Sequence, residues 1–199
     1  MRLFHFSDDP NIDIFTPRPV CIPAQRPEGM AWLNGPLVWA IDDAHQPMDL
    51  FPRECQRILL WATPETKRED YDRWWRGSPS KVLAYIEAAW LERVQEGTIY
   101  RYQLPGATFE DINDAGMWVS NVAVEPLQLG ILSDLPKEHQ AHSVELRALE
   151  NLLPLKGVWH TSLHASGIRL RNAQHWGKPG WTHSKKGRVV PVTEPDPAS

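Results

Sequence analysis

The stretch Leu3-Phe4-His5-Phe6-Ser7-Asp8-Asp9-Pro10 opens the chain with an alternating pattern that predicts a β-strand, ended by an acidic turn and a proline. Successive side chains of a strand point to opposite faces, so His5 and Ser7 share one face. An imidazole beside a hydroxyl can bind ribose hydroxyls or a carboxamide. The alternative is a structural histidine that is hydrogen-bonded at the end of a sheet.

Further strands are predicted outward from this stretch. Two continuous apolar runs of strand length occupy residues 37–41 and 57–62, and residues 98–104 are aromatic and β-branched before Pro105-Gly106. Residues 118–120 and 122–132 supply one or two more strands, and residues 166–171 alternate as a final one. In that last strand Arg169 and Arg171 share a face, where they either reach an anion or lie in solvent.

Helices are predicted between some of these strands. Residues 65–76 have the charged and aromatic composition of a short surface helix. Residues 137–152 look helical, with Leu146, Leu149 and Leu152, and Leu153 just beyond them, on one side. Residues 82–94 fit a helix, but a strand over 82–86 followed by a helix over 87–95 fits equally well. Helices and strands do not alternate regularly, so the predicted fold class is α+β.

Composition bounds the class of protein. With 42% hydrophobic residues among 199, the chain is too apolar to be disordered, and its 18 prolines concentrate in a loop over 16–36 and in the C-terminal part. We expect one domain over residues 1–175 and a flexible tail over 176–199. The tail contains basic residues at 185, 186 and 188, from which we expect only weak attraction to anions.

Charge and hydropathy exclude several functions. The net charge of -4 argues against bulk nucleic-acid binding, and no segment has the roughly 20 apolar residues that cross a bilayer. The N-terminus lacks an apolar signal core, so a cytoplasmic location is expected. Cys21 and Cys55 have no CxxC spacing and are expected to be inert thiols.

Few motifs suggest chemistry. Nucleotide loops of the GxxxxGK[ST] and GxGxxG types and the GxSxG elbow are absent. The pairs His139/His142 and His160/His164 have helical ligand spacing, which keeps a metal-dependent hydrolase as a minor alternative. They have neither an HExxH motif nor a cysteine partner, so no metal is predicted.

The ten tryptophans are mostly predicted to lie in the core, among them Trp39, Trp61, Trp90 and Trp118. One member of the Trp74-Trp75 pair is expected near the surface. Together with the 16–36 loop, this pair is the candidate surface for a protein partner.

Several segments resemble a small bacterial family of uncharacterised proteins, over about residues 2–173. The resemblance is carried by the opening strand, by Val38-Trp39-Ala40-Ile41-Asp42 through Leu50-Phe51-Pro52-Arg53, and by Glu87-Ala88-Ala89-Trp90-Leu91. Trp118-Val119-Ser120 and Ile168-Arg169-Leu170-Arg171-Asn172 complete it in the same order. This family has no established activity.

A fainter resemblance is to ADP-ribosyltransferase-like folds, in which a first strand carries H-x-[ST] and a later strand reads W-V-S. It implies two small, mostly antiparallel sheets that form a cleft, flanking helices and NAD as cofactor. The site residues it implies are His5, Ser7, Trp39, Arg53 and Arg171 for NAD, with His5 and Glu125 as the catalytic pair.

The expected glutamate before Trp118 is missing, because Gly116-Met117 stands there, with Asp111 and Asp114 in the preceding loop. The resemblance therefore implies an NAD- or nucleotide-binding domain with weak or absent transferase activity. It predicts that His5, Ser7 and one or both of Arg53 and Arg171 converge on one cleft. The alternative is a non-catalytic module that binds a protein or a small ligand.

Overall fold

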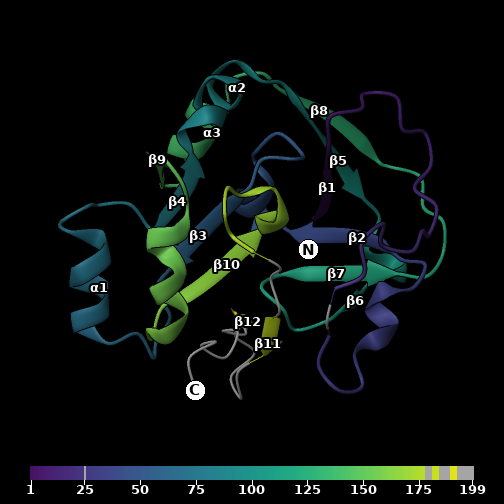
Figure 1. Cartoon of the computed structure of the whole chain (residues 1–199). Coiled ribbons are helices and arrows are strands. Elements are labelled where there is room, and N and C mark those ends of the chain that lie inside the picture. The colour runs from purple at the N-terminus through teal and green to yellow at the C-terminus, as the bar shows by residue number, and fades with distance from the viewer. Residues whose placement is uncertain (25, 178–180, 184–188, 192–199) are drawn as a thin grey trace.

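The computed structural model describes residues 1–24, 26–177, 181–183 and 189–191, and its body contains two β-sheets (Figure 1). The six-stranded sheet has the order β6 (Glu110–Asp111), β7 (Met117–Ser120), β2 (Val38–Asp42), β1 (Leu3–Ser7), β5 (Ile99–Leu104), β8 (Gln128–Leu132). The four-stranded sheet has the order β10 (His164–Ile168), β3 (Arg57–Trp61), β4 (Val82–Glu87), β9 (Val144–Leu149).

All neighbouring strands of the two sheets are antiparallel except β4 and β9, which are parallel. The helices are α1 (Arg68–Trp75), α2 (Leu91–Glu96) and α3 (Leu135–Ala141), with short 3₁₀ turns between strands. The predicted α+β class with mostly antiparallel sheets is therefore confirmed. No helix among the described residues has both the length and the apolar character needed to span a membrane.

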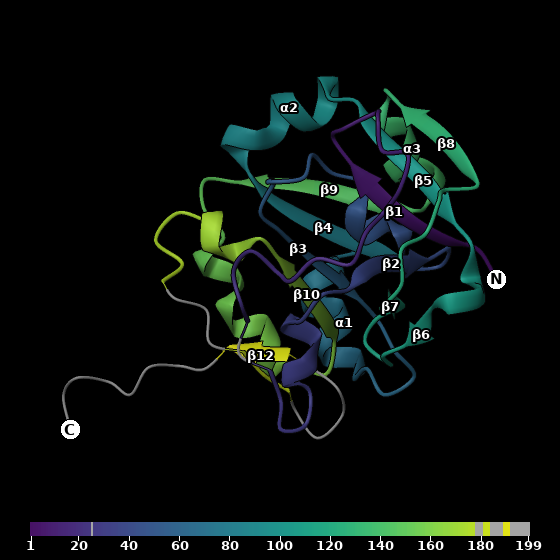
Figure 2. The ribbon, with the colours of Figure 1, turned by 90° about the vertical axis from the view of Figure 1, so that its right-hand side faces the viewer.

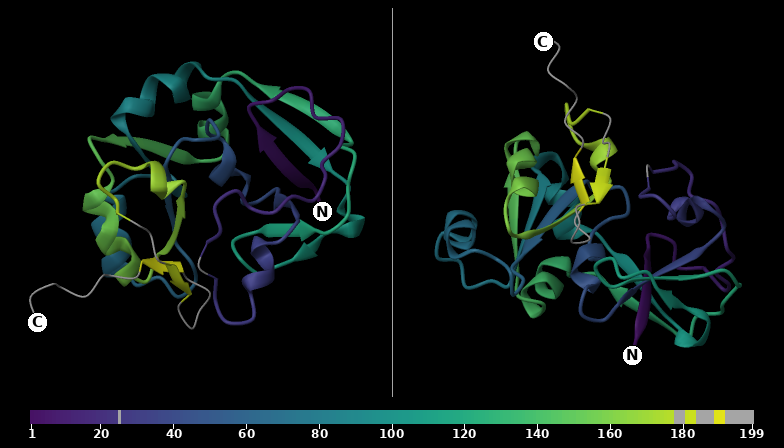
Figure 3. Two further views of the ribbon diagram at one scale, coloured as in Figure 1. Left: turned by 45° about the vertical axis from the view of Figure 1, so that its right-hand side comes forward. Right: turned by 90° about the horizontal axis from the view of Figure 1, so that it is seen from below.

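The three largest of the five apolar clusters among the described residues hold most of these elements together. Phe4 and Ile41 of the larger sheet pack against Leu59, Ala84 and Ile86 of the smaller one, which joins the two sheets. The opposite face of the smaller sheet is covered by α1 and by the 3₁₀ segment η5 (Leu153–His160). Viewed from below, the two sheets occupy separate halves of the molecule (Figure 3).

The third cluster covers the outer face of the larger sheet. The long segment between β1 and β2 runs along this face (Figure 2), and Phe15 from it packs against Leu3 and Tyr102. Backbone bridges join Phe15 to Val124 and Arg18 to Leu37. The predicted irregular loop over 16–36 contains the 3₁₀ turn η1 (Ala31–Asn34) and no other helix or strand among its residues described in the structure, 16–24 and 26–36.

The ambiguous segment after residue 81 forms strand β4, followed by the 3₁₀ turn η3 (Ala88–Trp90) and α2. The helix alternative over 82–94 is therefore wrong. β4 lies between β3 and β9 and is buried on both faces, so its residues are nearly all apolar. A run of this kind has no period that separates a buried strand from a buried helix.

The helix predicted over 137–152 is also wrong beyond its first turns. Asp134 caps α3 by accepting a hydrogen bond from the Lys137 amide (3.1 Å), but the helix ends at Ala141 and β9 follows. Ser143 turns the chain with φ of 56°. In β9, Val144 and Leu146 pack in the cluster between the sheets, whereas Arg147 between Leu146 and Ala148 contacts Tyr85 on the other face, a period of two that the leucines concealed.

The final strand ends at Ile168, because Arg169 adopts left-handed backbone angles and the 3₁₀ turn η6 (Leu170–Asn172) follows. Arg169 and Arg171 therefore do not share one strand face, contrary to prediction. Beyond residue 175, Trp176 is buried against Trp159, so the packed body extends slightly past the expected boundary. Most of the expected tail, with its basic residues 185, 186 and 188, lies outside the described residues. β11 (Trp181–His183) pairs with β12 (Val189–Pro191).

Candidate functional site

His5 lies where β1 and β2 separate. The two strands pair only through Leu3 with Asp42 and Phe4 with Ile41, and they diverge beyond Phe4. The His5 Nδ1–H donates to the main-chain oxygen of Trp39 (2.8 Å), which the divergence has left without a strand partner. The ring also packs on Phe15, with centroids 4.8 Å apart. His5 thus has the structural contact foreseen as its alternative role.

The electrostatic surroundings of His5 keep its ring neutral. Burial lowers its pKa, the Trp39 carbonyl opposes this shift, and the nearby charges of Arg53 and Arg18 lower the pKa further. Asp49 acts in the opposite direction. A neutral ring that donates from Nδ1 retains Nε2 as an acceptor, so His5 can accept a hydrogen bond from a ligand hydroxyl.

Ser7 and Trp39 do not join His5 as the resemblance implies. The buried Ser7 hydroxyl accepts a hydrogen bond from the Asp9 amide (3.1 Å), in the turn that ends β1. Because Phe4 pairs with Ile41, Trp39 belongs to the opposite face of the sheet from His5. The Trp39 indole packs beside Leu33 and Leu37. Only its backbone contacts His5.

Glu125 is exposed in the connection between β7 and β8, one residue beyond the bridge of Val124 to Phe15. No described hydrogen bond or ion pair involves the Glu125 carboxylate. None joins any other carboxylate to the His5 ring. Asp49 is the acidic residue whose charge acts on His5, and it was not among the predicted site residues. The predicted catalytic pair is therefore not assembled.

Arg53 and Glu54 are the two central residues of a tight turn. The Cys55 amide donates to the Pro52 carbonyl (2.9 Å), which closes the turn and exposes both central side chains. The Arg53 amide donates to the Asp8 carboxylate (3.1 and 3.3 Å), which ties the turn to the end of β1. The Arg53 turn, residues 52–55, therefore adjoins the strand that carries His5.

A second turn, residues 169–172, docks on the first. Asn172 donates from its side chain to the Glu54 main-chain oxygen (2.8 Å) and carboxylate (3.0 Å). Arg169 Nε donates to the Arg53 carbonyl oxygen (3.2 Å). Arg169 has φ of 55°, a backbone conformation that costs energy for any residue with a Cβ and that occurs more often at functional sites. Two turns more than a hundred residues apart thus form one surface.

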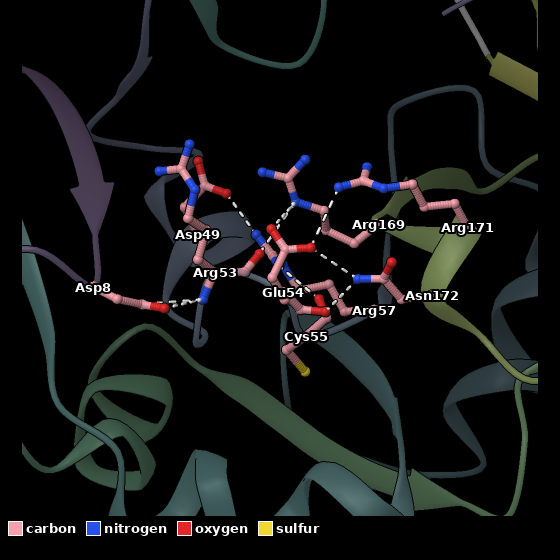
Figure 4. Close-up of polar contacts among 9 residues, drawn as sticks. All are labelled: Asp8, Asp49, Arg53, Glu54, Cys55, Arg57, Arg169, Arg171 and Asn172. Carbon is pink, nitrogen blue, oxygen red and sulfur yellow. Dashed lines mark hydrogen bonds and ion pairs between the residues drawn. The ribbon is translucent and has the colours of Figure 1, made fainter. Parts of the chain in front are cut away.

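Arg169 and Arg171 flank the Glu54 carboxylate on this surface, and Arg53 precedes Glu54 in the same turn (Figure 4). Glu54 lies 3.6 Å from Arg169 and 3.3 Å from Arg171 in ion pairs. The Asn172 amide and the three arginines lower the pKa of Glu54, and burial lowers that of Arg169. No described hydrogen bond or ion pair involves the Arg53 guanidinium. We call Arg53, Arg169 and Arg171 the arginine cluster.

Arg57 supports the cluster from below. Its buried guanidinium donates to the main-chain oxygens of Met48 (2.6 Å) and Cys55 (3.0 Å) and to Asp49 Oδ1 (2.6 Å). These contacts connect the start of β3 to Met48 and Cys55, which lie before and after the tip of the Arg53 turn. Sequence reasoning missed Arg57, although an arginine at the head of an apolar strand is a signal for a buried, paired charge.

The structure therefore brings together some of the predicted residues. Arg53 acts electrostatically on both His5 and Glu54, and Glu54 pairs with Arg171, so these residues form one connected region. Trp39 contributes a carbonyl oxygen, Ser7 shapes the turn after β1, and Glu125 has no described contact with these residues. The result is a cationic surface at the end of β1, without a catalytic carboxylate.

These features define an α+β protein in which two turns, one from each half of the chain, carry an exposed arginine cluster. The family of unknown function DUF6886 matches residues 4–173, so the chain belongs to this family. The comparison with curated proteins and the comparison with solved structures gave no match. A resemblance to ADP-ribosyltransferases is not shown.

The four histidines of the hydrolase alternative lie on different elements. His139 is buried in α3 and donates from Nε2 to the Leu50 carbonyl (2.8 Å), whereas His164 stacks on Trp61 in β10. Over the described ranges, no three His, Cys, Asp or Glu side chains are grouped so as to hold a metal ion. His139 is therefore a structural residue in this fold.

Substitution of His139 by Gln is expected to reduce acid sensitivity. Burial lowers the pKa of His139 from 6.5 to about 4, so the unfolded chain binds the proton first and stability falls between pH 6.5 and 4. The loss for this one group is about 3 kcal/mol. Urea unfolding of wild type and His139→Gln at pH 7 and pH 4 measures it. Equal pH dependence in both proteins would contradict the assignment.

The predicted partner surface at Trp74-Trp75 is not exposed. Trp75 is buried in the core beneath α1, and Trp74 is half-buried with its ring edge-on to Tyr85. On the 16–36 loop, by contrast, Ile22 and Trp32 are 61% and 48% exposed. An apolar contact surface, if the protein uses one here, involves the loop and not the tryptophan pair.

Proposed function

We propose that this protein binds a phosphate-bearing nucleotide at the arginine cluster, with NAD as the first candidate. The observation that supports this is the Arg53 guanidinium, which is exposed at the tip of its turn and has no described partner. Arg169 and Arg171 lie beside it and share a single carboxylate. Guanidinium groups donate two parallel hydrogen bonds to phosphate oxygens, and several arginines together match the charge of a diphosphate.

His5 gives this proposal its ribose contact. Its Nε2 is an acceptor, because Nδ1 donates to the Trp39 carbonyl, and the charge of Arg53 acts on its ring. A ribose hydroxyl is a suitable donor to a neutral imidazole. The proposed ligand therefore has phosphate at the arginine cluster and ribose toward β1.

Transfer chemistry is expected to be weak or absent. An oxocarbenium-like transition state needs a carboxylate beside the ribose. Glu125 has no described contact with His5, and the Asp49 carboxylate is paired with Arg57 at 2.6 Å. The proposal is therefore nucleotide binding, with any turnover slow. It includes a cytoplasmic location, which suits two unpaired cysteines.

The proposal is tested by titrating the full chain with NAD in a calorimeter. Arg53→Gln is expected to weaken binding about tenfold, because one charged hydrogen-bonding group is lost and no described contact of the Arg53 side chain is disturbed. Arg73→Gln, an exposed arginine on α1, is the matched control and should bind as wild type does.

Two results would count against the proposal. The absence of both heat and a shift in melting temperature with NAD and with ADP-ribose at millimolar concentration would reject nucleotide binding. Equal weakening by Arg53→Gln and Arg73→Gln would mean that overall charge, not the arginine cluster, attracts the ligand. Raising the salt concentration separates these cases further, because nonspecific attraction is screened first.

A second candidate function is protein binding through the 16–36 loop. It is favoured by the exposure of Ile22 and Trp32, since exposed large apolar side chains on one loop are candidates for a contact surface. The double substitution Ile22→Ser and Trp32→Ser should abolish such an interaction and leave NAD binding intact, which separates the two functions.

A further inference from the structure

Asp42 and His45 form a fixed pair directly after β2. Asp42 Oδ1 accepts hydrogen bonds from the His45 amide (2.9 Å) and from its ring Nδ1–H (2.8 Å). The carboxylate thereby sets the orientation and the tautomer of the imidazole. No described contact involves Nε2, so this nitrogen is available to a ligand.

Gly116 closes one side of this pair. Its main-chain oxygen accepts a hydrogen bond from the Asp42 amide (2.9 Å), and its φ is 73°. A Cβ at this position would lie 2.2 Å from His45 Nδ1 and 2.7 Å from Asp42 Oδ2. Only a glycine lets the main chain approach so closely. The pair is thus held rigidly between two backbone segments.

His45 of this pair lines a cavity of about 460 Å³ between the loop after β2, strands β3 and β4, and helix α1. Its size lies in the range of small-molecule sites. Trp61 and Tyr71 supply aromatic walls, and Met48, Leu59 and Pro79 supply apolar ones. Trp61 is immobilised by His164, which stacks on one face at 4.0 Å.

Lys81 gives the cavity a positive charge. Its amide is anchored to the Ser143 carbonyl (2.9 Å), and its exposed side chain has no described ion pair. Lys81 and His45 both line the cavity. The cavity therefore combines aromatic walls, one ammonium group and one imidazole, but no carboxylate except the one engaged by His45.

This cavity is distinct from the arginine cluster. In the β3–β10 ladder, Trp61 pairs with His164 at one end, and Arg57 pairs with Ile168 at the other. Four residues of strand separate the two ends, a distance of about 13 Å. A ligand in the cavity thus uses different side chains from those proposed to bind a nucleotide.

We propose that the cavity beside Asp42 and His45 binds a small aromatic carboxylate. The ring packs against Trp61 and Tyr71, and the carboxylate pairs with the Lys81 ammonium. The imidazole of His45, held by Asp42, contributes a second polar contact to the ligand. A single ring system with a short acidic arm fits the volume, whereas a dinucleotide does not.

The test uses calorimetry or ligand-observed NMR with indole-3-acetate and with its neutral amide on the full chain. Wild type is expected to bind the acid at least about tenfold more tightly than the amide, the difference of one charged hydrogen bond. Lys81→Gln should remove this preference. Lys67→Gln, at an exposed position outside the cavity, should retain it.

Further variants keep the result clear. His45→Gln should weaken binding of the acid by about tenfold, and its melting temperature shows whether the fold survives. Arg53→Gln should bind the acid as wild type does, so failure of the nucleotide proposal leaves this one intact. Equal affinity for acid and amide, or no binding of either at millimolar concentration, would overturn the proposal.

Discussion

Arg57→Met is expected to lower the free energy of unfolding by about 3–5 kcal/mol, the usual cost of removing one partner from a buried charge pair. The Arg57 side chain is 4% exposed and satisfies two main-chain oxygens and the Asp49 carboxylate. Methionine fills a similar volume but leaves all three acceptors without their donor. An unpaired buried acceptor loses its hydration without compensation.

Urea unfolding monitored by circular dichroism measures this loss, provided that unfolding is two-state. Arg68→Met is the matched control, because Arg68 is an exposed arginine whose ion pair with Asp72 lies on the surface of α1. The control should unfold close to the wild-type midpoint. A small change in the free energy of unfolding of both variants would show that the hydrogen bonds of Arg57 contribute little to stability.

Arg57→Met also tests the support of the arginine cluster. Arg57 connects Met48 and Cys55, on either side of the turn that presents Arg53. If the variant remains folded, its affinity for NAD should fall although Arg57 itself is buried away from solvent. Unchanged affinity would show that the Arg53 turn keeps its position without this support.

Gly116→Ala is expected to disrupt the Asp42–His45 pair and to abolish binding of indole-3-acetate. The left-handed backbone alone costs alanine about 1–2 kcal/mol. The contact of 2.2 Å with His45 Nδ1 adds to this, because the ring is held between Asp42 and the cavity and has little room to move. Thermal unfolding and ligand titration measure the two effects.

Gly29→Ala is a well-matched control. Gly29 has φ of 80°, but a Cβ there would meet nothing within 4 Å. This variant carries the backbone penalty without the collision, so the difference between the two variants isolates the contact with His45. If Gly116→Ala and Gly29→Ala lose the same stability and both bind indole-3-acetate, the Asp42–His45 pair tolerates displacement.

Local patterns were sufficient for part of the fold. The alternation in residues 3–7 and the apolar runs of β2 and β3 predict the observed strands, and α1 follows its charged and aromatic composition. β4 and β9 were harder, because a strand buried on both faces has no period and leucines spaced by three or four imitate a helix. Their pairing with each other, not their own sequence, makes them strands.

The candidate sites, like the fold, could be predicted from the sequence only in part. Sequence reasoning selected His5, Arg53 and Arg171, and the structure connects them through Glu54, which lies 117 positions before Arg171. It could not select Asp49 or Arg57, whose roles depend on burial. Sequence reasoning did not select the Asp42–His45 pair, because Gly116 and Trp61 approach it from distant parts of the chain.

The sequence by itself determined the α+β class, the first strand with its His5, and the absence of the common nucleotide loops. Those properties depend on neighbours within a few residues, where side-chain alternation and turn chemistry act. Only the tertiary structure decided which faces His5 and Trp39 occupy, that two arginine-bearing turns meet, and that a cavity opens beside His45. These depend on strand register and on contacts between distant segments, whose energies no local pattern contains.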